Sequence, residues 1–121
     1  MADYRSVGGD NGYRVGDDGS VWTRLRRKGL GNGGGVCYVE GTDWRVLVPT
    51  THRSGHLYVR IRGVRRYVHH LVLEAFVCKK PSGQEACHFP DRNPVNNALS
   101  NLCWGTHKEN MAHAAVHGTG N

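Results

Sequence analysis

The sequence has little that would support a membrane-spanning, secreted or calcium-binding protein. No apolar run approaches the roughly 18–20 residues that cross a bilayer, and the first residues, Met-Ala-Asp-Tyr-Arg, contain no apolar signal-peptide core. Acidic residues number 10 against 16 Lys and Arg, which gives a formal net charge of +6. This excess of positive charge favours a polyanionic partner. We therefore expect a cytoplasmic protein whose thiols are reduced.

The cysteines lack the close spacing of a structural zinc site. Cys37, Cys78, Cys87 and Cys103 include no Cys-x-x-Cys pair, whereas such sites usually contain at least one. Small, partly buried thiols are the simpler interpretation. A zinc site built from the last three cysteines and nearby histidines stays open as the alternative.

Large hydrophobic side chains are also scarce. Hydrophobic residues make up 38% of the 121 residues, whereas glycine alone contributes 17. The length allows one compact domain or two very small ones. The composition predicts a modest core and many loops rather than long buried helices.

The first 50 residues predict short strands joined by glycine-rich turns. Residues 12–15 and 20–23 are strand-like, and the Gly-Asp-Asp-Gly between them is typical of a hairpin turn. Residues 29–35 contain five glycines and predict a flexible loop. Residues 43–49 predict a third strand that the final proline ends.

The middle of the chain predicts a hairpin followed by a helix. Apolar side chains alternate with aromatic or basic ones over residues 57–62. This alternation predicts a strand with one apolar face and one aromatic and basic face that carries Tyr58, Arg60 and Arg62. Residues 65–68 predict its partner strand after a turn at Gly63. From His69 to Phe76 the apolar side chains recur at helical spacing, which predicts a short amphipathic helix.

The last third predicts two brief strands and a second helix. The strands are expected at residues 86–89 and 102–104. Thr106 and Glu109 form a Thr-x-x-Glu capping box, which predicts the start of a helix. The helix is expected to run to about His117, where a glycine follows.

Candidate chemistry lies between these two strands and at the start of the last helix. His88 ends the first strand, a loop rich in asparagine follows, and Asn110 lies one turn into the helix after the second strand. This order predicts that His88 and Asn110 lie on the same side. Hydrolysis of a phosphodiester needs a base to activate water and a hard cation to hold the phosphate. His88 is the candidate base. The Asn110 amide oxygen is a candidate ligand for Mg²⁺, which prefers oxygen ligands.

Four motifs in this region carry a resemblance to a known family. They are Val-His-His-Leu-Val-Leu-Glu-Ala-Phe at residues 68–76, Cys-His at 87–88, Asn-Asn-Ala-Leu-Ser-Asn-Leu-Cys-Trp at 96–104 and Thr-His-Lys-Glu-Asn at 106–110. In order and spacing they resemble the HNH endonucleases, which have the ββα-metal or His-Me finger fold. The likeness is closest to small phage and homing-type members. It implies a bacterial or phage-infected host cell.

The resemblance implies an α+β protein in which a small β-rich module, residues 1–55, precedes a ββα-metal nuclease domain, residues 56–121. The implied activity is metal-dependent hydrolysis of DNA phosphodiester bonds, by nicking or double-strand cleavage. The implied partner is double-stranded DNA. A monomer would nick one strand per encounter, whereas cutting both strands would need a homodimer or two successive events.

Two alternatives to the nuclease interpretation remain. The first is a catalytically weak or inactive DNA-binding protein on the same fold. His70, Cys87 and Cys103 motivate it because each stands where the family commonly has another residue. The second is a zinc-stabilised interaction module without nuclease activity.

The resemblance also implies roles for individual residues. His88 is the general base, and Asn101 pins the loop through backbone hydrogen bonds and orients His88. Asn110 is the metal ligand on the helix, and His113, one turn further on, is another candidate ligand. Cys87 stands where many relatives have a metal-binding Asp or His. Mg²⁺ is the expected ion, with Mn²⁺, Zn²⁺ or Ni²⁺ as alternatives because a thiolate prefers softer metals.

Basic stretches in both halves are candidate DNA contacts. The residues are Arg26, Arg27, Lys28, Arg60, Arg62, Arg65, Arg66 and His69. A solvated charged surface is the usual alternative for such stretches. The net charge and the family resemblance instead favour phosphate contacts. The module at residues 1–55 and the predicted hairpin that begins at residue 57 are therefore the candidate DNA-binding elements.

Overall fold

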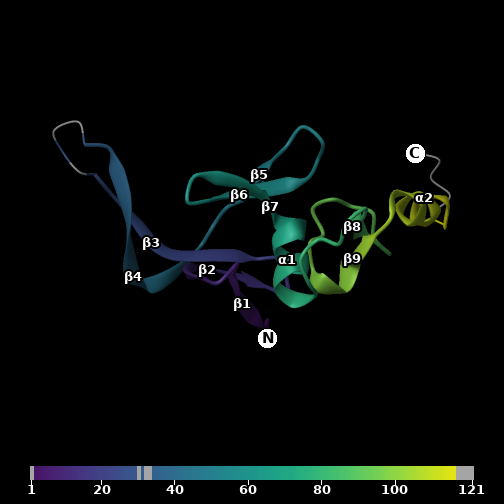
Figure 1. Cartoon of the computed structure of the whole chain (residues 1–121), viewed down its shortest axis with the longest axis horizontal. Helices are drawn as coiled ribbons and strands as arrows, with labels where there is room; N and C mark the ends of the chain where they lie inside the picture. Colours follow the sequence, from purple (N-terminus) through teal and green to yellow (C-terminus); the bar gives the residue numbers. More distant parts are fainter. Residues whose placement is uncertain (1, 30, 32–33, 117–121) are drawn as a thin grey trace.

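The computed structural model describes residues 2–29, 31 and 34–116. In this part of the chain, three small antiparallel sheets surround one central helix, and a second helix lies at one end (Figure 1). The mixed, strand-rich fold expected from the sequence is confirmed. No helix among the described residues is long and apolar enough to cross a membrane.

The N-terminal sheet has four strands in the order β1-β2-β3-β4. The strands are β1 (Tyr4–Val7), β2 (Asp10–Gly16), β3 (Val21–Gly29) and β4 (Val36–Val46). The predicted first hairpin is confirmed, because Val15 pairs with Val21 across the turn. Gly19 adopts a φ of +88° in this turn, a conformation that glycine tolerates best.

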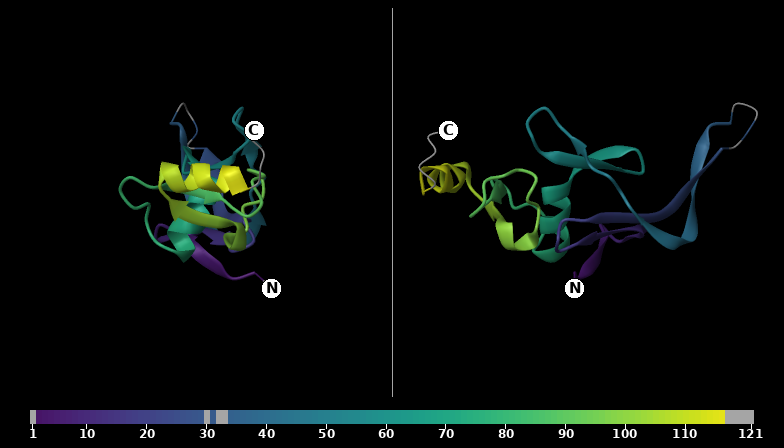
Figure 2. Two further views of the ribbon diagram at one scale, coloured as in Figure 1. Left: turned by 90° about the vertical axis from the view of Figure 1, so that its right-hand side faces the viewer. Right: turned by 180° about the vertical axis from the view of Figure 1, so that it is seen from behind.

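Strand β4 is longer than the sequence predicted. The prediction placed a strand only at residues 43–49, but pairing with β3 extends β4 back to Val36 and ends it at Val46. Cross-strand hydrogen bonding, which no local pattern reports, accounts for the difference. Strands β3 and β4 therefore form a long hairpin that projects away from the helices (Figures 1 and 2). Residues 30 and 32–33 of the predicted glycine-rich loop lie outside the described residues.

The second sheet is made by β5 (Thr50–Thr51), β6 (Leu57–Ile61) and β7 (Val64–Tyr67). The alternation predicted for β6 is confirmed, because Val59 is buried and Arg60 is exposed. The expected domain boundary after residue 55 falls between β5 and β6, which pair with each other. The division into two domains therefore stays a prediction.

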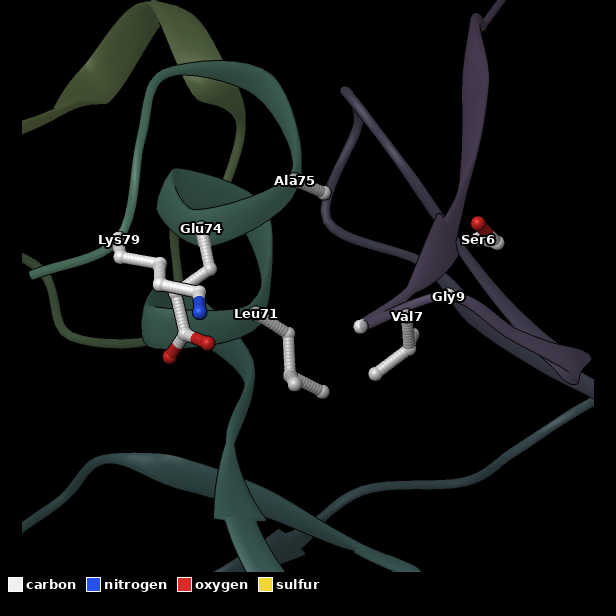
Figure 3. A pocket seen from close by; sticks show the side chains of 8 residues that line it. Ser6, Val7, Gly9, Leu71, Glu74, Ala75 and Lys79 are labelled. Atoms are coloured by element: carbon white, nitrogen blue, oxygen red, sulfur yellow. The ribbon is translucent and has the colours of Figure 1, made fainter.

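Helix α1 (Val68–Phe76) fills the centre of the molecule. Its buried face joins a single hydrophobic cluster with side chains of the N-terminal sheet, of β6 and of β9 (Leu102–Gly105). Figure 3 shows Leu71 of α1 and Val7 of β1 on the two sides of a small pocket where the helix meets the sheet. The amphipathic helix predicted from residue 69 is confirmed, and it begins one residue earlier.

The C-terminal third supplies a strand pair and a helix. Strand β8 (Glu85–His88) pairs antiparallel with β9, and helix α2 (His107–Val116) follows β9. A short 3₁₀ turn, η1 (Leu99–Asn101), lies in the connection between the strands. The predicted capping box is confirmed, because the Thr106 amide donates to the Glu109 carboxylate at 2.8 Å and the Glu109 amide donates to the Thr106 hydroxyl at 3.2 Å.

The central position of α1 predicts which of its valine side chains can be shortened to alanine without loss of stability. Val72 is 0% exposed in α1, whereas Val77, which caps the same helix, is 58% exposed. We expect Val72→Ala to lower the free energy of unfolding by about 2 kcal/mol, since it removes buried methyl groups and leaves a cavity. Val77→Ala is the matched control and is expected to stay within about 0.5 kcal/mol of the wild type. Urea unfolding measures both, and equal losses would contradict the packing.

Candidate active site

A cleft of about 310 Å³ brings the two principal candidate residues together. It forms where the end of β8, the loop after it, helix α2 and the β5–β6 loop meet. Its lining consists of Ser54, His56, Ala86, His88, Arg92, Pro94 and Asn110. His88 and Asn110, 22 positions apart in the sequence, therefore share one cleft, as the sequence predicted.

The hydrogen bond made by His88 defines which of its nitrogens can act as a base. His88 is buried, and its Nε2 lies 2.8 Å from the amide oxygen of Asn97. An amide oxygen only accepts, so Nε2 carries the proton and Nδ1 keeps the lone pair. The sequence analysis treated Asn97 as a turn residue and missed this contact. The only sequence feature that could have suggested a role for Asn97 is its position in the asparagine-rich loop after His88.

Asn101 pins the loop, as expected. Its side chain accepts from the Asp91 amide at 2.7 Å and donates to the carbonyls of Asp91 and Asn96 at 2.6 and 3.2 Å. Its backbone carbonyl accepts from the Phe89 amide next to His88. The imidazole of His88 is held by Asn97, so any orientation of His88 by Asn101 is indirect.

Asn110 is paired with a carboxylate that the sequence analysis did not single out. Its amide nitrogen donates to Glu85 Oε1 at 2.7 Å, and His107 Nδ1 lies 3.3 Å from the same oxygen. The hydrogen bond from Asn110 is the main reason that the pKa of Glu85 is lowered. Glu85 is therefore an ionised oxygen donor beside Asn110, and only its place three residues before His88 could have suggested it.

Among the expected metal ligands whose side chains the structure describes, Asn110 lines the cleft and Cys87 does not. Cys87 is 1% exposed and does not line the cleft, and burial, reinforced by Cys103, raises the pKa of its thiol to about 12. A protonated thiol is a poor metal ligand. The side chain of His113 lies outside the described part of the chain.

Oxygen donors suit this site better than sulfur does. No three His, Cys, Asp or Glu side chains among the described residues form a group that could hold a metal. The amide oxygen of Asn110 and the Glu85 carboxylate are hard donors. They fit an ion such as Mg²⁺, which keeps several waters and needs few protein ligands. They fit a closed zinc site, with its nitrogen and sulfur ligands, less well.

His88 is one of three packed imidazoles. The ring centroid of His56 lies 5.6 Å from that of His88 and 4.9 Å from that of His69, and the His69 and His88 centroids are 5.1 Å apart. The sequence analysis did not anticipate His56, which lies on the loop before β6. Burial lowers the pKa of His56 and, much further, the pKa of His69 to about 3, with the neighbouring histidines contributing.

This packing corrects the expectation that His69 contacts DNA. His69 is 7% exposed, and its Nδ1 is buried without a partner among the described residues. A neutral, enclosed imidazole has neither the charge nor the surface for a phosphate contact. Helical periodicity alone did not reveal this burial, because neighbouring histidines cover the ring.

Two of the candidate arginines are committed to ion pairs within the protein. Arg62 follows β6 with a φ of +49°, and its guanidinium holds Asp10 of β2 at 2.7 Å. Arg66 pairs with Glu74 of α1 at 2.7 Å. The expectation that Arg62 shares a strand face with Arg60 is corrected, since Arg62 lies in the turn.

The other basic candidates are on the surface. Arg60 and Arg65 are exposed on the β6–β7 hairpin, where Arg65 stacks over the Tyr58 ring at 4.3 Å. Arg26 and Lys28 are exposed on β3. The side chain of Arg27 lies outside the described part of the chain.

Comparison with known proteins supports the resemblance found in the sequence. Residues 66–112, from β7 into α2, match a family model described as HNH endonuclease. This segment is therefore similar to the HNH endonucleases and is called the HNH segment below. It contains His88, Asn97, Asn101 and Asn110, so the cleft is built largely from the HNH segment. No curated protein sequence matches the chain.

A solved structure extends the likeness to nearly the whole chain. The structure, described as "DNA binding and cleavage by the HNH homing endonuclease I-HmuI", superposes with a TM-score of 0.67 at 23% identity. The match covers 98% of this chain and 61% of that chain. The HNH segment and the N-terminal sheet therefore share a fold with that enzyme, and the present chain spans about three fifths of its length.

The burial of His69 predicts that the folded protein loses stability in acid. The pKa of His69 is about 3 in the folded protein, against about 6.5 when unfolded. As the pH falls, His69 is protonated first in the unfolded chain. The stability that neutral His69 contributes is therefore fully present above pH 6.5 and is lost progressively as the pH falls from 6.5 to 3. The loss is expected to reach about 1.4 kcal/mol per pH unit.

Urea unfolding across this pH range tests the expectation. His69→Phe keeps a ring in the core but cannot be protonated, so its stability is expected to depend less steeply on pH. A slope for His69→Phe as steep as that of the wild type would show that His69 is not the group responsible.

Proposed function

We propose that the protein is a metal-dependent endonuclease that hydrolyses DNA phosphodiester bonds, with His88 as the general base. The observation that carries the proposal is the placement of His88 in one cleft with Asn110, with its Nε2 proton held by Asn97. That hydrogen bond leaves Nδ1 as the nitrogen able to accept a proton. The HNH segment and the fold shared with a DNA-cleaving enzyme support the same reaction.

The proposed reaction is hydrolysis by an activated water. Nδ1 of His88 accepts a proton from water, the water oxygen attacks phosphorus, and the bond to the 3′ oxygen breaks. The 3′ oxygen leaves with the bonding electrons and takes up a proton from solvent. The products are a 5′-phosphate and a 3′-hydroxyl. Arg92 lines the same cleft and adds a positive charge near the position of the phosphate.

A divalent ion would be held by the oxygens of Asn110 and Glu85. When bound, such an ion neutralises charge on the scissile phosphate and stabilises the leaving oxygen. Mg²⁺ fits these donors best, as argued above from their chemistry. Cys87 has no part in the proposed site, because its thiol is buried and its pKa is raised to about 12, so it stays protonated.

Double-stranded DNA is the proposed partner. The β3–β4 hairpin and the β5–β6 loop both rise on one side of the molecule in two perpendicular views (Figures 1 and 2). Arg60 and Arg65 lie on the strands next to this loop, and Arg26 and Lys28 lie on β3. We infer that the duplex lies along this side, with residues 1–55 as a binding module and the segment from residue 56 supplying the chemistry.

Cleavage of supercoiled plasmid tests the proposed chemistry. We expect the wild-type protein to nick DNA with Mg²⁺ or Mn²⁺ and to lose activity in EDTA. His88→Ala is expected to lower the rate by about 100- to 10,000-fold, the usual contribution of a general base. Lys108→Ala is the control, because Lys108 is exposed on α2 and does not line the cleft.

The outcomes separate the nuclease from its alternatives. Equal activity of wild type and His88→Ala would remove His88 as the base. Binding of DNA without cleavage under Mg²⁺, Mn²⁺, Zn²⁺ or Ni²⁺ would instead identify a DNA-binding protein on the nuclease fold. The burial of Cys87, at a position where relatives often have a metal ligand, is the observation that favours this alternative.

Charge reversal tests the proposed DNA path. Arg60→Glu is expected to weaken duplex binding by roughly tenfold and to reduce the slope of log affinity against log salt concentration by about 1, since a phosphate contact is lost. Arg62 needs a different design, because reversing it alone also breaks its ion pair with Asp10.

The double variant Asp10→Arg/Arg62→Glu keeps both the net charge and a pair of opposite charges. We expect it to bind DNA as the wild type does. A loss of affinity in the double variant, with the fold intact, would return Arg62 to the DNA-binding surface. An unchanged salt slope in Arg60→Glu would remove the β6–β7 hairpin from that surface.

A further inference from the structure

The turn between β2 and β3 packs against the loop that carries Asn97. The Leu99 amide donates to the Asp17 carbonyl at 2.7 Å, which ties this loop to the turn across more than 80 residues of sequence. A Cβ atom on Gly19 would lie 2.9 Å from the Asn97 carbonyl oxygen and 3.1 Å from its Cβ. The two backbones therefore approach so closely that only glycine fits at position 19.

Asn97 has little else to hold its side chain. It is 4% exposed, and its amide nitrogen is buried without a partner among the described residues. Its amide oxygen meets Nε2 of His88. The position of this amide therefore depends on the backbone of residues 97–99, and that backbone rests on the turn.

We propose that the β2–β3 turn of the N-terminal sheet is a positioning element for His88 and acts through Asn97. The inference rests on the proposed function of His88. Contact runs from the backbone at Gly19 to the backbone of Asn97, and from the Asn97 amide to Nε2 of His88. Asn97 is thus a positioning residue that fixes which ring nitrogen carries the proton.

The proposal gives the N-terminal sheet a second role besides DNA binding. Strand β3 begins at Val21, directly after this turn, and also carries Arg26 and Lys28. The sheet would then serve catalysis as well as DNA binding. A purely structural turn would instead stabilise the fold without affecting His88.

A matched pair of glycine substitutions separates these two roles. Gly19→Ala adds both a strained φ of +88° and a clash with Asn97. Gly9→Ala, in the β1–β2 turn, adds similar strain at a φ of +81°, but its Cβ meets nothing within 4 Å. The comparison therefore cancels the general cost of a side chain at positive φ.

The kinetic measurement is nicking at saturating DNA, together with the dissociation constant for the duplex. We expect Gly19→Ala to lower the maximal rate at least about tenfold, because a small displacement of a reacting group is costly. Its affinity for DNA is expected to stay within about twofold of that of Gly9→Ala. Equal rates for the two folded variants would overturn the proposal.

Nuclear magnetic resonance supplies a readout that does not depend on activity. We expect the proton on Nε2 of His88 to exchange slowly with solvent in the wild type and in Gly9→Ala. The exchange is expected to be faster in Gly19→Ala and in Asn97→Leu, which has no acceptor. Retention of slow exchange in Asn97→Leu would overturn the contact on which the inference depends.

Asn97→Asp tests the direction of the hydrogen bond. A carboxylate can only accept, so this variant is expected to keep the slow exchange and to nick faster than Asn97→Leu. Activity equally low in both would contradict donation by His88.

If the wild type cleaves no DNA, the proposed function fails, whereas the exchange data on Gly19→Ala and Gly9→Ala still decide whether the turn positions His88. If Gly19→Ala fails to fold, the Asn97 pair tests the same contact.

Discussion

The packing of helix α1 against the N-terminal sheet is the constraint on which the rest of the structure depends. Leu71, Val72 and Leu73 are almost fully buried and belong to the same hydrophobic cluster as Val15 and side chains of β9. Burial of such side chains contributes roughly 1.5–3 kcal/mol each. The helix thereby fixes the distance between the sheet and the strand pair β8–β9. The contact between the β2–β3 turn and the loop after β8 requires that distance.

The burial of its neighbours suits the proposed role of His88 as a base. His56 and His69 pack against His88, and burial lowers the pKa of both, so both stay uncharged at neutral pH. Uncharged neighbours do not repel a proton that His88 accepts. Glu85 is charged instead, because the hydrogen bond from Asn110 lowers the pKa of its carboxyl group. Neutral imidazoles thus pack around His88, whereas the anionic Glu85 carboxylate lies beside Asn110.

Much of the architecture could be predicted because its signals are local. The alternation in β6 and the Thr106–Glu109 capping box involve residues two or three positions apart, and both are confirmed. The placement of His88 and Asn110 on the same side was predicted from the strand–loop–strand–helix order of their segment, and both line one cleft. The extension of β4 back to Val36 was not predicted, since glycine-rich sequence gives no sign of pairing with a distant strand.

The sequence by itself determined both helices, most of the strands, the basic charge and the HNH segment, because composition, periodicity and motif spacing are properties of neighbouring residues. Only the tertiary structure decided which side chains are accessible and what they touch. It buried Cys87 and His69, paired Arg62 with Asp10, and placed Asn97 against His88. Each of these outcomes depends on how separate elements pack. The free energy of burying or pairing a polar group is set by neighbours that the local sequence does not specify.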